Sequence, residues 1–254
     1  MTADVIVVGG GPVGLLTAGL LDAAGTGVEV FERNREFDRY SKGIHLHPRS
    51  LEVLTLLETG DGRRLSDILV AQGMRVPSAH FAALEAKLAY GELDTPFPFG
   101  LMVPQWKTRE VLAEYLRERG VPVHYGVEIT EIGQTEDEVT VRAGAGLHTA
   151  RYLVGADGAR SLVRTAAGIP FPGSDPTMVS FVADVPAAEP VDGLRYFWSD
   201  AGYTGVMPLG ENGIRVFGAE ASDTGLTPGE VRRRQRQPLC GRGSAGRAHP
   251  DLRT

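Results

Sequence analysis

The chain has 254 residues, of which 42% are hydrophobic and 23% charged, as in ordinary folded globular proteins. Its length allows one large domain or two modest ones. No apolar run approaches the ~20 residues that a membrane-crossing helix needs, and the N-terminus lacks the basic start of a signal peptide, so we expect a cytoplasmic protein. The single cysteine, Cys240, excludes an internal disulfide, and we interpret it as an incidental thiol.

The formal net charge of −6 is unevenly distributed. From Arg232 to the end there are seven arginines and one acid, so this tail carries +6 and the preceding residues carry −12. The acidic body disfavours nucleic-acid binding. The tail has no hydrophobic periodicity and no aromatic residues between its arginines, so we expect disorder and neither a nucleic-acid nor a membrane role. Such a stretch is typical of a shifted reading frame, and an evolved basic arm is the alternative.

The first predicted elements form a βαβ unit around a glycine-rich loop. An apolar strand at residues 5–8 runs into Gly9-x-Gly11-x-x-Gly14, which opens a helix, and a second strand ends at Glu32. Gly9 permits the tight turn, Gly11 lets backbone approach a pyrophosphate, and Gly14 lets helix pack on strand. This pattern predicts a dinucleotide site, and the alternative is a plain βαβ unit without a ligand.

Two further residues support the nucleotide interpretation. Pro12 fits the first helical turn, because a proline there loses no hydrogen bond. Glu32 lies at about the ~20-residue distance from the loop at which an acid accepts both ribose hydroxyls. The fingerprint does not by itself select one dinucleotide.

The segment after the second strand is less regular. We expect a helix over residues 50–57, with Ser50 as its N-cap. His45 and His47 precede it at alternate positions. Without further ligands nearby, we interpret them as exposed or as lining a cleft rather than as a metal site. The following stretch shows no clear periodicity. We interpret residues 93–100 as an excursion that carries aromatic side chains and does not belong to the first sheet.

Regular structure resumes at Gln105 and continues to about residue 168. The predicted elements are a helix over 109–119 capped by Thr108, a parallel strand over 121–125, an antiparallel hairpin over 127–132 and 139–142, a strand over 150–155, and a short helix over 161–167. Asp157-Gly158 follows the last strand, and by itself this pair is typical of an ordinary turn.

Beyond residue 173 the pattern changes to strands alone, separated by turns at residues 189–190, 200–202 and 210–213. The predicted strands cover 179–185, 195–199, 204–208 and 213–218. We therefore predict an α/β protein: a Rossmann-like domain with an inserted antiparallel ribbon, followed by part of an antiparallel sheet.

Three features in one order resemble single-component FAD-dependent aromatic hydroxylases, the class A flavoprotein monooxygenases. They are the glycine loop with Glu32-Arg33, Gln105 before a helix, and Asp157-Gly158-x-x-Ser161-x-x-Arg164. Phe171-Pro-Gly with Thr177-Met178 is similar to the aromatic-polyketide branch.

The resemblance implies a domain order. The FAD-binding domain would comprise residues 1–75 and 102–172, with a substrate-domain excursion at 76–101, an incomplete substrate sheet at 173–231 and the tail at 232–254. The family's second glycine-aspartate motif is missing, since Gly60-Asp61 is the only such pair and stands in the wrong context. We therefore expect a C-terminally truncated member.

The resemblance also implies cofactor contacts. The ADP half of FAD would be held by Gly9, Gly11, Pro12, Gly14, Glu32 and Arg33. Lys42 stands where the family usually has an arginine beside the flavin, and a lysine keeps the charge but lacks the planar fork. Gln105 would contact the flavin side, while Asp157 and Gly158 would bind the ribityl chain and take part in passing NADPH.

The implied activity is hydroxylation of a polycyclic aromatic, polyketide-like substrate. NADPH would reduce FAD, O₂ would add to form a hydroperoxyflavin, and its distal oxygen would pass to the aromatic ring. The sequence points to no general base and to no metal ligands. The alternative is an inactive remnant that binds at most a nucleotide or a partner protein, with self-association through an uncovered sheet edge.

Overall fold

The structure is a computed structural model that describes residues 3–36, 43–80, 87–173, 179–187, 189, 191–199, 202–210 and 213–220. The chain divides into two compact units, Met1–Pro172 and Gly173–Thr254. The tail from residue 232 and the helix expected from residue 227 lie outside the described residues. No helix among the described ranges is long and apolar enough to cross a membrane.

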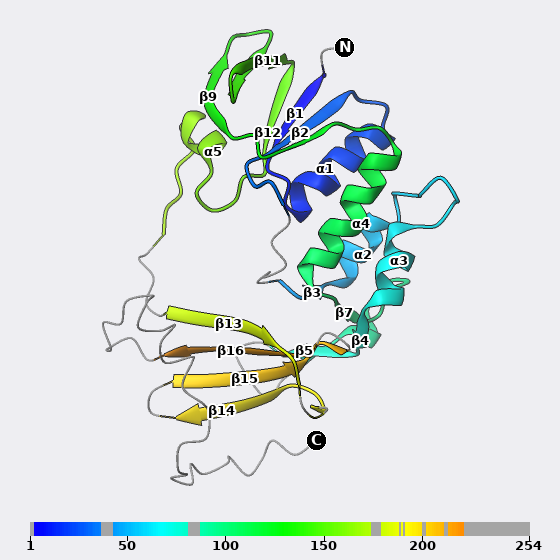
Figure 1. Ribbon diagram of the computed structural model, residues 1–254. Helices are drawn as coiled ribbons and strands as arrows, with labels where there is room; N and C mark the ends of the chain where they lie inside the picture. The colour runs from blue at the N-terminus through cyan, green and yellow to red at the C-terminus, as the bar shows by residue number, and fades with distance from the viewer. Residues whose placement is uncertain are drawn as a thin grey trace. The chain divides into compact units, whose positions relative to one another are not determined.

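A four-stranded parallel sheet organises the first unit. Its order is β12 (Tyr152–Gly155), β1 (Val5–Val8), β2 (Val28–Glu32) and β8 (Val123–Tyr125). All four residues of β1 are buried, as expected for a strand covered on both faces. Helices α1 (Pro12–Ala23) and α4 (Gln105–Glu118) pack side by side on one face (Figure 1).

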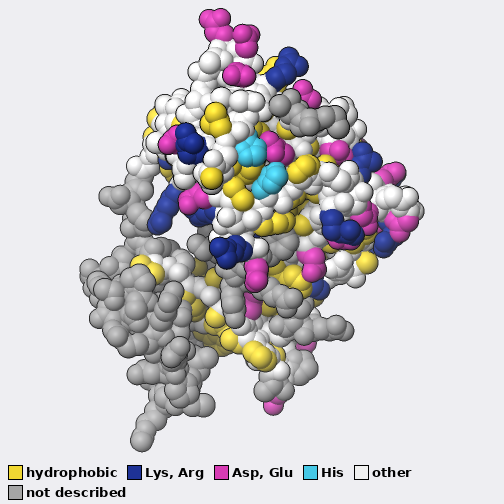
Figure 2. Space-filling model, turned by 45° about the horizontal axis from the view of Figure 1, so that its top comes forward, with side chains coloured by type: hydrophobic (Ala, Val, Ile, Leu, Met, Phe, Trp, Pro, Cys, Tyr) yellow, Lys and Arg dark blue, Asp and Glu magenta, His cyan; other side chains and the backbone are white. Residues whose placement is uncertain are grey.

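An antiparallel ribbon covers the other face and has one strand more than the predicted hairpin. It consists of β9 (Ile129–Gln134), β10 (Val139–Ala143) and β11 (Gly146–Ala150), of which β11 was not predicted. Its buried residues form a second core with Ile6, Val8 and Phe31 of the sheet. At its margin the rings of His124 and His148 lie against Phe31, and histidine side chains are visible beside acidic ones on the face drawn in Figure 2.

The segment between β2 and α4 contains shorter elements. They are β3 (His45–Leu46), α2 (Pro48–Leu54), α3 (Leu65–Gln72), β4 (Met74–Val76), β5 (Ser78–His80), β6 (Lys87–Ala89), the 3₁₀ turn η1 (Tyr90–Glu92) and β7 (Gly100–Met102). β7 lies between β3 and β4 in an antiparallel sheet. Helix α3 was not predicted, although Leu65 and Leu69, one helical turn apart, are both fully buried.

Two predicted helix starts are wrong. Helix α2 begins at Pro48 after His47, so Ser50 lies inside it, and α4 begins at Gln105 after Pro104. Thr108 is therefore an internal, buried residue of α4 and not its cap. In both cases the chain enters the helix at a proline, whose fixed φ suits a helix start, and no hydroxyl cap is needed.

The second unit contains the predicted antiparallel sheet. Its order is β13 (Val179–Val185), β16 (Ile214–Glu220), β15 (Gly202–Pro208) and β14 (Arg195–Ser199). Asp184 is directly opposite Arg215, so their side chains share one face of this sheet. Tyr196 stands opposite Gly205, next to Phe217, and their rings meet edge to face at 5.8 Å.

Candidate cofactor site

The ends of three parallel strands bring the predicted site residues together. β1 leads into Gly9, β2 ends at Glu32, and β12 leads into Ala156 and Asp157. β1 lies between β2 and β12, so this edge is the point at which successive connections leave in opposite directions. Ligands of open α/β sheets bind at such an edge.

The glycines of the loop differ in what their missing side chains would meet. Gly9 has a φ of +112°, and a Cβ there would overlap the Ala156 carbonyl oxygen. A Cβ on Gly14 would overlap the Gly9 carbonyl oxygen, and one on Gly10 would lie 2.8 Å from Cβ of Glu32. Gly11 has an ordinary φ of −74°, and its Cβ would meet nothing within 4 Å. Internal packing therefore explains the other glycines but not Gly11.

Glu32 is held beneath this loop. Its side chain is 7% exposed, and Oε2 accepts the backbone N–H of Gly10 at 2.7 Å. Oε1 accepts the backbone N–H of Asn34 at 2.8 Å and its side-chain Nδ2–H at 2.7 Å. Asn34 was missed from sequence, although an asparagine soon after a strand end commonly turns back on its own backbone. The carboxylate thus has one orientation, and all three of these donors are uncharged.

The Asp157 side chain makes local hydrogen bonds at the turn that follows β12. Its carboxylate accepts the Ser161 hydroxyl at 2.5 Å and the backbone N–H of Leu162 at 2.6 Å, at the start of α5 (Leu162–Ala166). Ser161 caps the same helix by accepting the Arg164 N–H at 2.9 Å. Gly158 adopts a φ of +83°, a conformation that favours glycine. The Asp157 side chain therefore fixes the turn whose backbone lies against Gly9.

Gln105 lies at the start of α4 and holds Gly43. Its Oε1 accepts the Gly43 N–H at 3.2 Å, and its own N–H donates to the Gly43 carbonyl at 3.1 Å. Lys42, the preceding residue, lies outside the described residues, and Arg33 is exposed. Farther along α4, Arg109 lies near Tyr125. Burial raises the pKa of Tyr125, and the charge of Arg109 opposes that shift.

His47 has a hydrogen-bond partner, Tyr90, that the sequence did not suggest. Nδ1 of His47 lies 3.0 Å from the hydroxyl of Tyr90, and the His45 and His47 rings are 4.5 Å apart. Burial, and secondarily His47, lowers the pKa of His45. Within the described ranges, no three His, Cys or acidic side chains are grouped to hold a metal ion.

Gly60-Asp61 lies in an exposed turn between α2 and α3. The Asp61 carboxylate accepts Nε–H of Arg63 at 2.7 Å and the Thr59 hydroxyl. All three residues belong to the same turn, so this carboxylate is engaged locally.

The comparisons with known proteins agree on one family. The family described as FAD binding domain matches residues 2–234. YhjG of Bacillus subtilis, an uncharacterized aromatic compound monooxygenase, is 35% identical over 222 residues, which is 85% of this chain and 43% of the relative. The dialkyldecalin synthase of Streptomyces rugosporus is 35% identical over 227 residues, which is 87% of this chain and 47% of the relative. The solved anhydrotetracycline hydroxylase of Streptomyces rimosus gives a TM-score of 0.77 at 32% identity, covering 92% of this chain and 48% of the other.

The chain spans a little under half the length of these relatives. The predicted relationship to FAD-dependent aromatic hydroxylases and the predicted α/β class are confirmed, and FAD is the cofactor of the family. The chain belongs to the FAD binding domain family.

Proposed function

We propose that the protein is an FAD- and NAD(P)H-dependent monooxygenase that hydroxylates a polycyclic aromatic, polyketide-like substrate. The single observation that carries the cofactor assignment is Gly11, because the space beside its Cα is open where the other loop glycines are packed. Support for the substrate class comes from the anhydrotetracycline hydroxylase, whose name denotes a polycyclic aromatic compound. The chemistry that FAD supplies when bound is acceptance of a hydride from NAD(P)H and activation of O₂.

The residues present fit this cofactor. In this proposal the backbone at Gly11 and the first turn of α1, opened by Pro12, bind the pyrophosphate, where the helix dipole favours negative charge. Glu32 accepts one ribose hydroxyl on Oε2, because three of its roughly four lone-pair sites already accept N–H groups. The ribityl and flavin portion is assigned to Gly158, Asp157 and the Gln105–Gly43 pair.

The domain assignment follows the same proposal. Residues 1–75 and 102–172 form the cofactor domain, 76–101 the substrate excursion, and 173–231 the substrate sheet. Within the described part of that sheet, β13 and β14 are the outer strands. Val179 and Phe197 on them are 53% and 58% exposed, so we place self-association there.

Gly11→Val tests the cofactor assignment. We expect the variant to lose at least about tenfold in FAD affinity, because a branched side chain takes the space proposed for the pyrophosphate. Stability should fall by no more than about 1 kcal/mol, the scale of an N-cap change. Flavin fluorescence quenching gives the affinity and thermal melting gives the stability.

Gly60→Val is the matched control, since a Cβ on Gly60 also meets nothing within 4 Å and its φ is not positive. We expect its FAD affinity to equal that of the wild type. Equal affinities in both variants, or a wild type that takes up no FAD at millimolar concentration, would contradict the assignment.

A second function is favoured by one observation. The dialkyldecalin synthase is as similar to this chain as the monooxygenase YhjG is, at 35% identity. One relative is therefore named for a reaction other than monooxygenation, and a non-oxidative role or an inactive nucleotide-binding remnant is the alternative. NADPH consumption with an oxygenated product supports the first proposal, and FAD retention without NADPH consumption supports the second.

A further inference from the structure

Two side chains of one short segment reach the excursion defined above as residues 76–101. His47, the N-cap of α2, pairs with Tyr90 of η1 at 3.0 Å. Glu52, one turn further along α2, accepts the Thr95 hydroxyl on Oε1 at 2.6 Å. Both pairs join residues 43 positions apart. We call them the two-point clamp.

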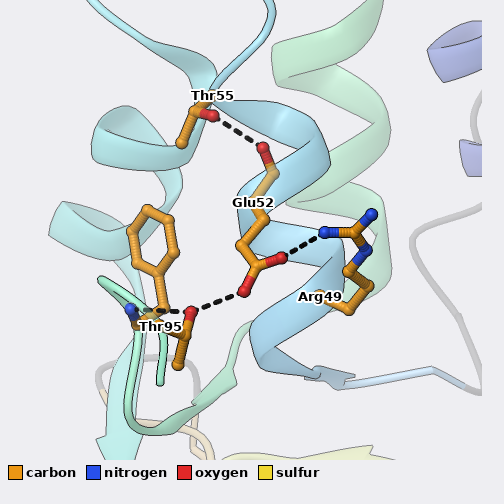
Figure 3. Close-up of polar contacts among 5 residues, drawn as sticks. Arg49, Glu52, Thr55 and Thr95 are labelled. Atoms are coloured by element: carbon orange, nitrogen blue, oxygen red, sulfur yellow. Dashed lines mark hydrogen bonds and ion pairs between the residues drawn. The ribbon is translucent and has the colours of Figure 1, made fainter. Parts of the chain in front are cut away.

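Besides its bond with Thr95, Glu52 makes polar contacts with Arg49 and Thr55. Its Oε2 accepts Nη1–H of Arg49 at 2.5 Å, and its backbone carbonyl accepts the Thr55 hydroxyl at 2.6 Å (Figure 3). Its side chain is 26% exposed, whereas that of Arg49 is 85% exposed. The bonds from Thr95 and then Arg49 hold the pKa of Glu52 below its ordinary range. Two hydrogen bonds therefore hold the Glu52 carboxylate in place, and the Arg49 side chain that donates one of them is mostly exposed to solvent.

Further contacts hold the residues on the excursion side of the clamp. The Thr95 hydroxyl oxygen accepts the Phe97 N–H at 3.2 Å, and the ring of Phe97 is buried in the core beneath α2. The guanidinium carbon of Arg75 lies 4.7 Å from the centre of the Phe99 ring. Tyr90 is 5% exposed. A hydrogen bond to Thr95 thus sets the path of backbone that carries two aromatic side chains.

The α2 side of the clamp is continuous with the candidate cofactor site. Gly43 makes two hydrogen bonds with Gln105, and the Ile44 carbonyl accepts the Val103 N–H at 2.8 Å. β3 then pairs with β7 and leads directly into His47. Gly43, which is bonded to Gln105, therefore lies in the same ten-residue stretch as His47 and Glu52. This stretch connects the proposed flavin contact with both pairs of the clamp.

We propose that Glu52 and His47 are positioning residues that hold residues 90–99 of the excursion in register with Gln105 and Gly43, so that an aromatic substrate on these residues meets the flavin in one orientation. This inference rests on the proposed function for its catalytic consequence. Release of the clamp leaves FAD binding intact, because neither pair includes a residue of the glycine loop. It lowers the share of NADPH consumption that ends in oxygenated product.

Thr95→Val and Thr95→Ser provide the test. The valine variant keeps the shape of the side chain but removes both the donor to Glu52 and the acceptor of the Phe97 N–H, while the serine variant keeps the hydroxyl. We expect backbone amides of residues 93–99 to exchange hydrogen at least about tenfold faster in the valine variant, because the bond to the Glu52 carboxylate and the bond from the Phe97 N–H are both lost. Exchange in the serine variant should stay within about twofold of the wild type.

The catalytic readout is product formed per NADPH consumed. We expect a loss of at least about threefold in Thr95→Val, restored in Thr95→Ser, with FAD affinity within about twofold of wild type throughout. Glu114→Gln is the matched control, because Glu114 also pairs with an arginine three residues away on a helix, Arg117, which does not belong to the excursion. It should leave both readouts unchanged.

The outcomes separate the two proposals. If the wild type forms no oxygenated product, the proposed function fails, and hydrogen exchange still decides whether the clamp exists. Unchanged exchange in Thr95→Val would overturn the clamp. A loss of product accompanied by an equal loss of FAD affinity, or a loss that Thr95→Ser does not restore, would overturn the positioning role.

Discussion

Each unit buries one charged side chain among its described residues, and the two are satisfied in different ways. In the first unit Glu32 accepts hydrogen bonds from the N–H groups of Gly10 and Asn34, all of them uncharged. In the second unit Arg215, 2% exposed, donates to both carboxylate oxygens of Asp184 at 2.7 and 2.9 Å. The first arrangement keeps a negative charge beside an open loop, and the second neutralises a charge inside a sheet.

This difference separates a binding role from a structural one. The three N–H groups on Glu32 bring no positive charge to it, and about one of its four lone-pair sites remains for a ligand. A bidentate ion pair uses both partners on each other, and breaking it leaves an uncompensated charge. The two sites should therefore respond differently to the removal of a single charge.

Asp184→Asn should have the largest effect on stability. It removes the carboxylate that pairs with the buried guanidinium of Arg215, and breaking a buried pair typically costs up to about 3–5 kcal/mol. Urea denaturation measures the change. Glu131→Gln, which breaks the exposed Arg142–Glu131 pair, is the control and should cost less than about 1 kcal/mol. Similar losses in the two variants would remove the distinction between buried and exposed pairs in this chain.

Glu32→Gln should have a smaller effect on stability and a larger one on binding. The amide of the new side chain turns a donor toward N–H groups that need an acceptor, at a cost of about 1–3 kcal/mol. FAD affinity should fall at least about tenfold, whereas the folded Asp184→Asn variant should bind FAD as the wild type does. An Asp184 variant that loses affinity while the Glu32 variant keeps it would reverse the comparison.

Substitution of Glu52 should have the smallest effect on stability. Its carboxylate is of a third kind, near the surface and bonded to Thr95 and Arg49. Its folded pKa lies below the ordinary value of 4.5, so it stabilises the fold above that pH and loses this contribution as the pH falls through the folded pKa. Glu52→Gln should therefore melt below wild type at pH 6–7. The gap should narrow below pH 4.5, and a gap that widens in acid would contradict the assigned sign.

Local patterns predicted part of the site. The glycine spacing, the apolar strand and the acid at its end identified the loop and Glu32, because each signal depends on residues close in the chain. The β9–β10 hairpin and the second sheet were predictable for the same reason, since strands joined by short turns pair with their neighbours. The starts of α2 and α4 were mispredicted because a proline, not a hydroxyl residue, opens each helix.

The sequence by itself determined the βαβ unit, its glycine loop and the alternating strands, because periodicity and turn chemistry act over a few residues. Only the tertiary structure decided that Gly11 alone of the loop glycines faces open space, that Glu52 meets Thr95, and that Arg215 meets Asp184. Such contacts join residues far apart in the chain. They depend on how helices pack and on the register between strands, which no local pattern encodes.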